Sequence, residues 1–420
     1  MANSVTQSIL VVGGGMAGMT AAIEAAEAGY DVYLVEKNSY LGGRVAQLNK
    51  YFPKLCPPYC GLEINFRRMK QNPKVRFFTL AEVEGISGTE GDFTVSIKLN
   101  PRYVNGKCTA CGKCAEACAM EIDNPFNYGM DKIKAAYLPH EMAFPIRYVL
   151  DPALVGSGEA QEVKDACPYD AIELDMQAQK MDLKVGAIVW ATGWKPYDTA
   201  KLDLYGFDQH PNVITNVMME RLASGNGPTK GKILRPSDNE APKTIGFIQC
   251  AGSRDENHLP FCSGICCLAS LKQATYIRDQ YPDAKIYIFF IDIRATDRLE
   301  DFYAKVKEDE NIVFFKGKVA QITEDPGTKN PILKVENTAT GELLEIPVDL
   351  AVLATGMQPA TSESQVPLPA AYDDYGFLAT DTGLPGLYGA GCVRTPANVA
   401  ESVADGTRAA LKAIQSIARR

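Results

Sequence analysis

Short apolar runs alternate with glycine-rich turns and helical patterns along this chain. The run ILVV at residues 9–12 is followed by a glycine cluster, a helical pattern that extends to Ala28 and a second strand-like run at 31–35. Two later runs, IVWATG at 188–193 and AVLATG at 351–356, are apolar segments that end in Ala-Thr-Gly. Such runs are typical of strands buried on both faces of a parallel sheet.

A second strand–helix–strand unit is predicted in the middle of the chain. Residues 244–249 have the pattern of a strand, 265–279 that of a helix and 285–291 that of another strand. Near the C-terminus, the segment 386–406 predicts a strand, a turn and a helix. Strands that alternate with helices in this way predict an α/β fold with Rossmann-like units.

The glycine cluster after the first strand has the spacing of a dinucleotide-binding loop. Gly13, Gly15 and Gly18 form G-x-G-x-x-G between strand and helix, and Glu36 stands at the tip of the second strand. Glycines let the backbone approach a pyrophosphate, the helix N-terminus favours its charge, and the acid can bond ribose hydroxyls. The arrangement predicts dinucleotide binding; the alternative is a glycine-rich structural turn.

FAD is favoured over NAD because further flavoprotein signatures follow downstream. The turn Leu41-Gly42-Gly43-Arg44, the two Ala-Thr-Gly strand ends and the C-terminal strand–turn–helix follow the layout of thioredoxin-reductase-like flavoproteins, which the chain resembles. That family usually ends its last motif in Gly-Asp, whereas this chain has Gly391-Cys392, which puts a thiol close to the expected flavin; no other catalytic residue is assigned. The candidate FAD-binding residues are Gly13, Gly15, Gly18, Glu36, Lys37, Gly43, Arg44, Thr192, Gly193, Thr355, Gly356, Gly391 and Cys392.

The bulk composition is that of an ordinary globular protein. The 420 residues are 46% hydrophobic and 22% charged, with a net charge of −8. This acidic balance, without a cluster of Lys and Arg, argues against a nucleic-acid surface. No apolar run approaches the roughly 18 residues of a membrane helix, and the N-terminal MANSVTQSILVV lacks the regions of a signal peptide. We expect a cytoplasmic chain that contacts a membrane, if at all, through a partner.

Tight cysteine groups in a cytoplasmic protein usually bind metal rather than form disulfides. Among the twelve cysteines, Cys108, Cys111, Cys114 and Cys118 have the C-x2-C-x2-C-x3-C spacing of bacterial ferredoxins. In two-cluster ferredoxins the fourth cysteine of such a run ligates the other cluster. Cys167, followed by a proline, looks like the end of a second ferredoxin half. We therefore predict that Cys108, Cys111, Cys114 and Cys167 hold one 4Fe–4S cluster in a ferredoxin-like insert.

Three other cysteines have open assignments. Cys118 could be a relic, or it could join Cys56 and Cys60 of the LCPPYC loop around a further centre. Cys56 and Cys60 could instead form a redox dithiol beside the flavin, although the pair comes later than in disulfide-reducing flavoproteins and lies amid three prolines. Structural or free thiols are an equal alternative.

A second group consists of Cys250, Cys262, Cys266 and Cys267, in the loop where a dinucleotide-binding unit would have its phosphate cradle. Adjacent cysteines would crowd a tetrahedral zinc site, and only three histidines are present. Four thiolates from a loop and a helix start could hold a second 4Fe–4S cluster, and Gly-Ser-Arg at 252–254 offers donors that could tune its potential. Buried, unreactive cysteines are the alternative. Thiols stand here in place of a phosphate-binding loop. This exchange favours a protein that passes electrons between fixed centres over one that takes them from a diffusible nicotinamide.

Several motifs together resemble the A subunit of heterodisulfide reductase over essentially the whole chain. They are GGGMAGMTAA, the LCPPYC loop, the ferredoxin-like insert, IQCAGSRDE and FCSGICC. The resemblance implies FAD, several iron–sulfur clusters and a cluster site at the motif that matches Cys250, Cys262, Cys266 and Cys267. The chain departs from that family in having no extension before the Gly13 strand and no two-cluster ferredoxin domain before its end at Arg420.

The short form is similar to the A subunits of quinone-interacting membrane-bound oxidoreductases, which are related to heterodisulfide reductase. This resemblance implies an electron-transfer protein with one FAD and two 4Fe–4S clusters. It also implies a second flavin/iron–sulfur subunit, a membrane subunit that reacts with menaquinone, and adenylylsulfate reductase as electron partner in dissimilatory sulfate reduction. The chain would then lie at the inner face of the cytoplasmic membrane.

Three alternatives stay open. An electron-bifurcating subunit, like the larger members of the heterodisulfide reductase family, is the main one, and the missing ferredoxin domains weigh against it. A free-standing pyridine-nucleotide disulfide reductase predicts a second G-x-G-x-x-G near residue 246, which is absent. A scaffold protein would carry vestigial motifs and an inert flavin.

The expected fold class is α/β, a two-domain thioredoxin-reductase-like FAD flavoprotein with Rossmann-like units and an inserted iron–sulfur module. The predicted parts are an FAD-binding domain at 1–100, 181–240 and 346–420, a ferredoxin-like insert at 101–180, and a Rossmann-like domain with a cysteine group at 241–345.

Overall fold

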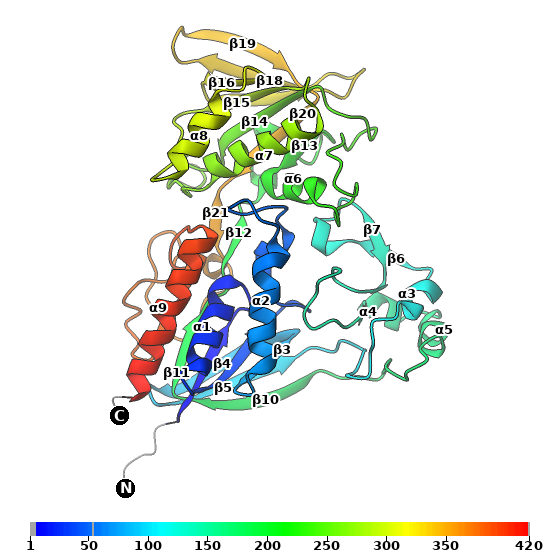
Figure 1. The fold of residues 1–420 in the computed structure, drawn as a ribbon, viewed down its shortest axis with the longest axis vertical. Helices are drawn as coiled ribbons and strands as arrows, with labels where there is room; N and C mark the ends of the chain where they lie inside the picture. Colours follow the sequence, from blue (N-terminus) through cyan, green and yellow to red (C-terminus); the bar gives the residue numbers. More distant parts are fainter. Residues whose placement is uncertain (1–5, 53, 419–420) are drawn as a thin grey trace. The chain divides into compact units, whose positions relative to one another are not determined.

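The computed structural model describes residues 6–52 and 54–418, which fall into two compact units (Figure 1). Unit 1 comprises Met1–Gln47, Cys56–Trp194 and Pro359–Arg420, and unit 2 comprises Leu48–Leu55 and Lys195–Gln358. The expectation that the N-terminus carries no leader rests partly on residues 1–5, which lie outside the described residues. Each unit is built around a parallel sheet, as the alternation of strands and helices predicts.

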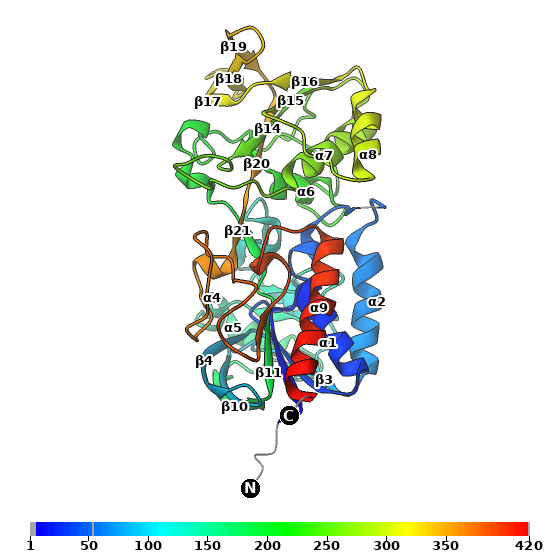
Figure 2. The same ribbon diagram turned by 90° about the vertical axis from the view of Figure 1, so that its left-hand side faces the viewer.

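The core of unit 1 is a five-stranded parallel sheet. Its strand order is β22 (Leu387–Gly389), β11 (Ala187–Trp190), β1 (Ser8–Val12), β2 (Asp31–Glu36) and β3 (Val75–Thr79). One face is covered by α1 (Met16–Glu27), α2 (Pro58–Gln71) and α9 (Val399–Ala418), as Figures 1 and 2 show. Because side chains alternate along a strand, Ile9 and Val11 pack on this helical side and Leu10 and Val12 on the other.

A three-stranded antiparallel sheet covers the second face. Its strand order is β10 (Gln179–Val185), β5 (Asp92–Leu99) and β4 (Ala81–Thr89). Phe93, Val95 and Leu183 of this sheet share a buried cluster with Leu10 and Val12 of β1. Unit 1 therefore has three layers: helices, a parallel sheet and an antiparallel sheet.

The chain between β5 and β10 forms a small module with its own core. It contains the strand pairs β6 (Glu121–Asp123) with β7 (Lys132–Lys134) and β8 (Ala136–Tyr137) with β9 (Val149–Leu150), and the helices α3 (Lys113–Ala117), α4 (Pro152–Val155) and α5 (Ala160–Asp165). A bridge between Val104 and Ile172 joins its two ends. Leu150, Leu154 and Val163 are buried at its centre.

Unit 2 contains the second five-stranded parallel sheet. Its order is β13 (Val213–Thr215), β20 (Leu350–Thr355), β14 (Thr244–Ala251), β15 (Lys285–Phe290) and β16 (Ile312–Lys316). The other elements are α6 (Asn216–Ala223), α7 (Cys266–Gln280), α8 (Leu299–Lys307) and an antiparallel sheet of β17 (Val319–Glu324), β18 (Pro331–Asn337) and β19 (Glu342–Pro347). The strand–helix–strand unit predicted within 244–291 corresponds to β14, α7 and β15.

Short elements complete the chain. The strands β12 (Trp194–Pro196) and β21 (Met357–Pro359) pair with each other. The 3-10 turns are η1 (Gly43–Gln47), η2 (Pro125–Asn127), η3 (Thr199–Lys201), η4 (Asp203–Tyr205), η5 (Ala360–Ser362) and η6 (Gly391–Val393).

The boundaries of the units differ from the predicted domains in three places. Residues 195–240 and 346–358, which we expected in the FAD-binding domain, lie in unit 2, because β20 pairs there with β13 and β14. The segment Leu48–Leu55 also lies in unit 2. Its backbone is held there by two buried side chains: Asn49 N–H donates to Glu220, and the carbonyl of Lys50 accepts from Lys272. Hydrophobic patterning alone does not reveal such long-range pairing.

No helix within the described ranges has the length and apolar character that crossing a lipid bilayer requires.

Candidate functional site

The three glycines of the β1–α1 loop serve different needs. Gly13 has a φ of +108°, and a Cβ there would collide with the carbonyl oxygen of Ala191, just after β11. A Cβ on Gly18 would collide with the carbonyl oxygen of Gly13. Gly15 is different, because the atom nearest its Cβ position, the Cα of Gly43, is 4.0 Å away. Gly13 and Gly18 are therefore required by packing, and Gly15 borders open space of the kind a pyrophosphate fills.

Glu36 ties the end of β2 to this loop. The side chain is only 6% exposed, its Oε2 accepts the N–H of Gly14 at 2.6 Å, and its Oε1 accepts that of Asn38 at 2.8 Å. Burial raises the pKa of Glu36, against the opposing effect of these hydrogen bonds. A carboxylate has about four acceptor sites, so acceptor capacity for ribose hydroxyls is left. Lys37, predicted beside it, is exposed.

The second glycine turn lies against the first. Gly42 N–H donates to the carbonyl of Gly14 at 2.8 Å, and Gly43 touches Gly15. Arg44 of η1 donates from Nε to the carbonyl of Trp194 at 2.7 Å, and its guanidinium carbon lies 4.9 Å from the centre of the Trp194 ring. The structure thus brings the two predicted glycine turns together in unit 1.

The Ala-Thr-Gly end of β11 lies in the same unit. The Oγ1 of Thr192 is shielded from solvent and has no hydrogen-bond partner among the residues described. Gly193 has a φ of +74°, its Cβ position is open, and its carbonyl accepts the N–H of Ala360 at 3.0 Å. An orphaned hydroxyl and an open glycine beside a dinucleotide loop fit an absent polar ligand such as FAD.

The C-terminal motif is held by an acid that sequence reasoning missed. Gly391, with a φ of +70°, packs on Ala17 of α1 and donates its N–H to the Oδ2 of Asp405 at 2.7 Å. Burial raises the pKa of the Asp405 carboxyl, but its bonds to Arg408 and Gly391 and the charges of Arg408 and Arg394 outweigh this and lower it. Asp405 is fourteen residues past Gly391, so only the fold of η6 and α9 brings it there.

Cys392 has local partners in the same segment. Its thiol donates to the carbonyl of Ala397 at 3.4 Å and lies 3.7 Å from the Oγ of Ser402. Burial raises the pKa of this thiol. The structure places this thiol in a buried, hydrogen-bonded position, and its predicted nearness to the flavin stays a prediction.

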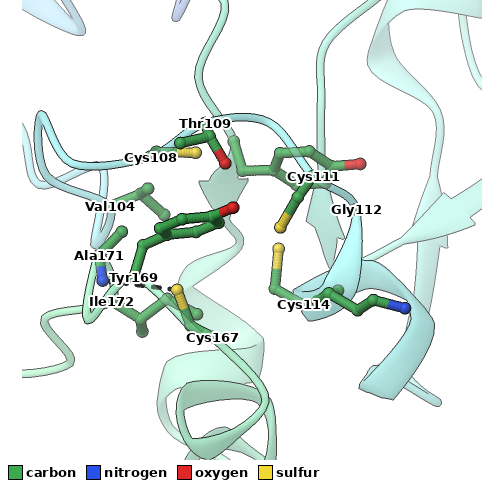
Figure 3. Close-up of a pocket in the computed structure, with 12 residues that line it drawn as sticks. Val104, Cys108, Thr109, Cys111, Gly112, Cys114, Cys167, Tyr169, Ala171 and Ile172 are labelled. Atoms are coloured by element: carbon green, nitrogen blue, oxygen red, sulfur yellow. Dashed lines mark hydrogen bonds between the residues drawn. The ribbon is translucent and has the colours of Figure 1, made fainter.

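The four cysteines assigned to the first cluster line one pocket of the inserted module. Figure 3 shows Cys108, Cys111, Cys114 and Cys167 around the ring of Tyr169. Cys114 is on α3, Cys167 follows α5, and the other two are in the loop before α3. Ala110 and Gly112 adopt left-handed φ values of +57° and +86° in this loop. The three cysteines of the ferredoxin spacing and the later Cys167 therefore line the same pocket, and their ligation of a cluster stays a prediction.

The environment of these sulfurs suits an iron–sulfur cluster. Ala110 N–H donates to the sulfur of Cys108 and Ala171 N–H to that of Cys167, each at 3.4 Å. Burial, mainly, raises the pKa of the Cys114 thiol to about 12, and the charges of Cys108 and Cys167 act in the same direction. Four thiolates that face one pocket repel one another unless a cationic group lies between them, and backbone donors to the sulfurs are a normal feature of iron–sulfur sites.

Cys118 lies apart from this pocket lining. It is 2% exposed in the core of the module, and its thiol donates to the carbonyl of Met120 at 3.4 Å. Cys60 is exposed near the start of α2, and Cys56 is half-buried just before it. These contacts support the structural alternative for Cys118, and the roles of Cys56 and Cys60 stay open.

The second cysteine group lies at the carboxyl end of β14. A bulge inserts one extra residue there, because Ile248 is opposite Leu353 whereas Ala251 is opposite Thr355. Cys250, inside this bulge, has a φ of +58°. Bulges of this kind re-aim a side chain and are common next to active sites. Cys262 is in the following loop, and Cys266 and Cys267 begin α7.

The thiols of this second group interact electrostatically. Burial, mainly, raises the pKa of Cys250 to about 11, and the charges of Cys267 and Cys262 add to this. Burial also raises the pKa of Cys266, with Cys267, Cys250 and Cys262 as further causes. The four predicted ligands are therefore close enough to act on one another.

The strand end at Thr355 and Gly356 belongs to this group. The thiol of Cys266 lies 3.6 Å from the carbonyl oxygen of Thr355. A Cβ on Gly356 would collide with the Oγ of Ser253 and lie 3.3 Å from that of Ser263. We expected Thr355 and Gly356 to contact FAD with the other Ala-Thr-Gly end; the structure places them in unit 2, beside the cysteines.

Two polar side chains next to Cys250 support an absent polar group here. Gln249 and Ser253 are each 2% exposed. Within the described part of the chain, neither the side-chain amide of Gln249 nor the hydroxyl of Ser253 has a hydrogen-bond partner. Orphaned buried groups are rare in native proteins and often mark the place of an ion or ligand. The residues present therefore fit a cluster.

Single-ion metal sites are a different case. Among residues 6–52 and 54–418, no three His, Cys, Asp or Glu side chains have the geometry to hold one metal ion. A zinc ion requires four ligands at about 2.0–2.3 Å from one point, whereas the thiolates of a cubane bind different irons.

Comparisons with known proteins agree on the fold and the first cofactor motif. The family described as "FAD dependent oxidoreductase" matches residues 8–55. Thioredoxin reductase from T. acidophilum is 15% identical, with a TM-score of 0.55, over 97% of this chain and 98% of that one. Bacillithiol disulfide reductase from Bacillus cereus is 16% identical, with a TM-score of 0.54, over 99% of both chains. At this identity they show the fold alone, the thioredoxin-reductase-like α/β fold predicted from the sequence.

Sequence relatives cover nearly the whole chain. An iron–sulfur A subunit of the CoB–CoM heterodisulfide reductase of Methanopyrus kandleri is 39% identical over 99% of this chain and 65% of its own length. The A subunit of the ferredoxin/F(420)H(2)-dependent CoB–CoM heterodisulfide reductase of Methanosarcina acetivorans is 36% identical over 98% and 53%, respectively. The chain thus spans between about half and two thirds of these relatives. It is a homologue of the heterodisulfide reductase A subunits, with the thioredoxin-reductase-like fold of FAD-dependent oxidoreductases.

Proposed function

We propose that this chain is the FAD- and iron–sulfur-containing electron-transfer subunit of a heterodisulfide-reductase-type complex. The observation that carries the proposal is the cysteine group of unit 2. It stands at the carboxyl end of β14 and the start of α7, where a dinucleotide-binding unit has its glycine loop. A protein that carries thiols at this position has lost the loop that binds a diffusible nicotinamide. In its place it has a site that can hold a fixed redox centre.

Unit 1 supplies the residues that would hold FAD. Gly15 leaves room for the pyrophosphate, and the N-terminus of α1 favours its charge. Glu36 would accept the ribose hydroxyls, and the orphaned hydroxyl of Thr192 is available to the flavin end. When bound, FAD exchanges electrons singly or in pairs and an iron–sulfur cluster exchanges them singly. The side chains of this unit would bind and orient the cofactor.

The two cysteine groups would hold one 4Fe–4S cluster each. The ligands of the first are Cys108, Cys111, Cys114 and Cys167, and those of the second are Cys250, Cys262, Cys266 and Cys267. Backbone N–H groups already point at Cys108 and Cys167 in the first group and at Cys262 in the second, where Gly264 donates at 3.3 Å. These donors stabilise thiolates and so favour ligation over free thiols.

The type of complex is inferred from the relatives. The named A subunits belong to heterodisulfide reductases, and some are named for ferredoxin, hydrogen or formate as further reactants. This supports a heterodisulfide-reductase-type assembly, with electron bifurcation as one mode, over the finer prediction of a link between menaquinone and adenylylsulfate reductase through a membrane subunit. That quinone-linked role is the second candidate.

Iron and acid-labile sulfide per FAD in the anaerobically purified chain test the proposal. About eight irons per flavin are expected for two cubanes. Replacing Cys266 and Cys267 with Ser should remove about half of the iron and leave FAD bound. An unchanged iron content in that variant, or a flavin that no partner protein reduces or reoxidises, would contradict the proposal.

A further inference from the structure

Two arginines and one aspartate border the second cysteine group. Asp292, two residues beyond β15, accepts hydrogen bonds on its Oδ1 from Nη1 of Arg254 at 2.9 Å and from Nε of Arg294 at 3.3 Å. The thiol of Cys267 lies 3.7 Å from the carbonyl oxygen of Asp292. One carboxylate therefore holds two guanidinium groups beside the residues that would bind a cluster.

Each arginine lies near different cysteines. Arg254 is four residues after Cys250, and its N–H donates to the carbonyl of Phe261, the residue before Cys262, at 3.1 Å. Arg294 is two residues after Asp292, whose carbonyl oxygen lies 3.7 Å from the thiol of Cys267. The two cations thus approach the cysteine group from two loops, one after β14 and one after β15.

Asp292 follows the second strand of its strand–helix–strand unit, near the place of the ribose-binding acid in a dinucleotide-binding unit. In a dinucleotide-binding unit, an acid at the end of the second strand bonds the ribose of the nucleotide. Glu36, the last residue of β2, occupies that position in unit 1. Its counterpart in unit 2 follows β15 and is engaged by Arg254 and Arg294 instead. In unit 2 the acid at this place binds two arginine side chains instead of a ribose.

We propose that Arg254 and Arg294, joined through Asp292, form a charge-compensating shell that raises the reduction potential of the cluster held by Cys250, Cys262, Cys266 and Cys267. This inference rests on the proposed function, because it requires a cluster at that site. Arg254 and Arg294 are positioning residues: they act through charge and hydrogen bonds on the cysteines and are not ligands.

The sign of the effect follows from electrostatics. Reduction adds one electron to the site, taken in the test from dithionite, and no bond forms or breaks. A fixed positive charge lowers the free energy of that added electron, so its removal makes the site harder to reduce. The side chain of Arg254 is 24% exposed and that of Arg294 is 48% exposed. Solvent screens an exposed charge more, so we expect the larger effect from Arg254.

Potentiometric titration of the full chain, followed by the electron-paramagnetic-resonance signals of the reduced clusters, tests the inference. In Arg254→Gln, the oxidised-to-reduced ratio of the second cluster at a fixed potential should rise roughly tenfold, which is about 59 mV for one electron. Arg294→Gln should shift it in the same direction by less, and more weakly still at high salt. Arg254→Lys and Arg294→Lys, which keep the charge, should restore most of the potential.

Two internal references sharpen the measurement. The first cluster should keep its potential in every variant. Lys334→Gln is the matched control: it removes one positive charge from β18 in unit 2, where Lys334 pairs with Glu345 at 3.7 Å. Iron content and thermal unfolding are measured for each variant, so that a lost cluster is not mistaken for a shifted one. If Arg254→Gln loses iron, the Lys variants and Arg294→Gln carry the test.

The possible results separate the inference from the proposed function. If wild-type protein and the Cys266/Cys267 serine variant contain equal iron, the proposed function itself fails. If the second cluster is present and its potential is unchanged in both Gln variants, only the shell is overturned. Tight binding of NADH or NADPH that Arg294→Gln abolishes would also overturn it, because the arginines would then be phosphate ligands.

Discussion

Gly43 and Gly15 touch across the two glycine turns of unit 1. A Cβ built on Gly43 would lie 2.9 Å from the Cα of Gly15, and Gly43 has a φ of +55°. The reverse is not true, because a Cβ on Gly15 would meet nothing closer than the Gly43 Cα at 4.0 Å. One glycine is therefore required by the protein itself, and the other is free of that constraint. The space beside Gly15 is available to a ligand.

Replacing Gly15 with Ala should separate ligand binding from folding. The backbone there has a φ of −78° and a ψ of −174°, which alanine adopts without strain. We expect the free energy of unfolding of the FAD-free protein to change by less than about 1 kcal/mol. FAD affinity should fall at least roughly tenfold, about 1.4 kcal/mol, because the methyl group takes the place of the pyrophosphate. Titration of the FAD-free protein with FAD measures this.

The matched control is Gly85→Ala in β4, where an added Cβ also meets nothing within 4 Å. It should leave FAD affinity unchanged. Gly43→Ala, in contrast, should lower both stability and affinity. Equal FAD affinity of Gly15→Ala and wild type would show that the pyrophosphate does not bind at this loop.

Cys118 and Cys167 should respond differently to replacement with serine. Cys167 lines the pocket with the other three cysteines, whereas Cys118 is buried in the core of the module. Cys167→Ser should lose one cluster, about four irons per chain. Cys118→Ser should keep its iron and lose roughly 1–3 kcal/mol of stability, because a hydroxyl replaces a buried thiol. Iron analysis and chemical denaturation check the two expectations; iron loss in Cys118→Ser alone would exchange the ligand assignments.

Local patterns were enough to predict the elements that carry the cofactor motifs. The strand, helix and strand expected at 244–249, 265–279 and 285–291 are found as β14, α7 and β15, shifted by two residues or fewer at each end. These segments follow from hydrophobic periodicity and from the spacing of cysteines and glycines, which depend on neighbours in the sequence. The assignment of Cys167 had a different basis, its resemblance to the last cysteine of a second ferredoxin half.

Contacts between distant segments could not be predicted in this way. Two identical Ala-Thr-Gly ends, at Thr192 and Thr355, lie in different units because β11 pairs with β1 and β20 pairs with β14. Asp405 reaches Gly391 and Asp292 reaches Arg254 only after helices and strands have packed. A single charged residue has no sequence pattern from which its partner in the folded protein can be predicted.

Asp405→Asn should make stability less dependent on acid pH. The folded pKa of Asp405 lies below its ordinary value of 3.8. Its contribution to stability is therefore fully present above about 3.8 and is lost as the pH falls through the lower folded pKa. At pH 7 the variant should be less stable by about 1–2 kcal/mol, because Arg394 and Arg408 lose their charged partner. This difference should shrink toward zero in strong acid.

Denaturation by urea at several pH values measures the effect, and Asp374→Asn at an exposed position is the control. A difference that does not change with pH would mean that the charge of Asp405 is unimportant.

Removing one partner of the buried ion pair between Glu220 and Lys272 should destabilise the fold strongly. Replacing both partners with apolar residues should destabilise it less than the two single changes together. The Nζ of Lys272 lies 3.0 Å from the Oε1 of Glu220, and both side chains are almost fully buried. Glu220 also accepts from the N–H of Asn49 at 2.9 Å, and Lys272 donates to the carbonyl of Lys50 at 2.5 Å. Lys272→Met leaves a buried carboxylate without its cation and should cost about 3–5 kcal/mol of unfolding free energy.

The double variant Glu220→Leu/Lys272→Met should be less destabilised than the sum of the two single variants, because no unpaired charge is then left in the interior. Lys334→Met, which breaks an exposed pair with Glu345, should cost less than about 1 kcal/mol. Proteolysis should become faster within residues 48–55 in the single variants, since both anchors of that segment pass through this pair. Strict additivity of the two single variants, with residues 48–55 equally protected in all proteins, would show that the pair does not hold the segment.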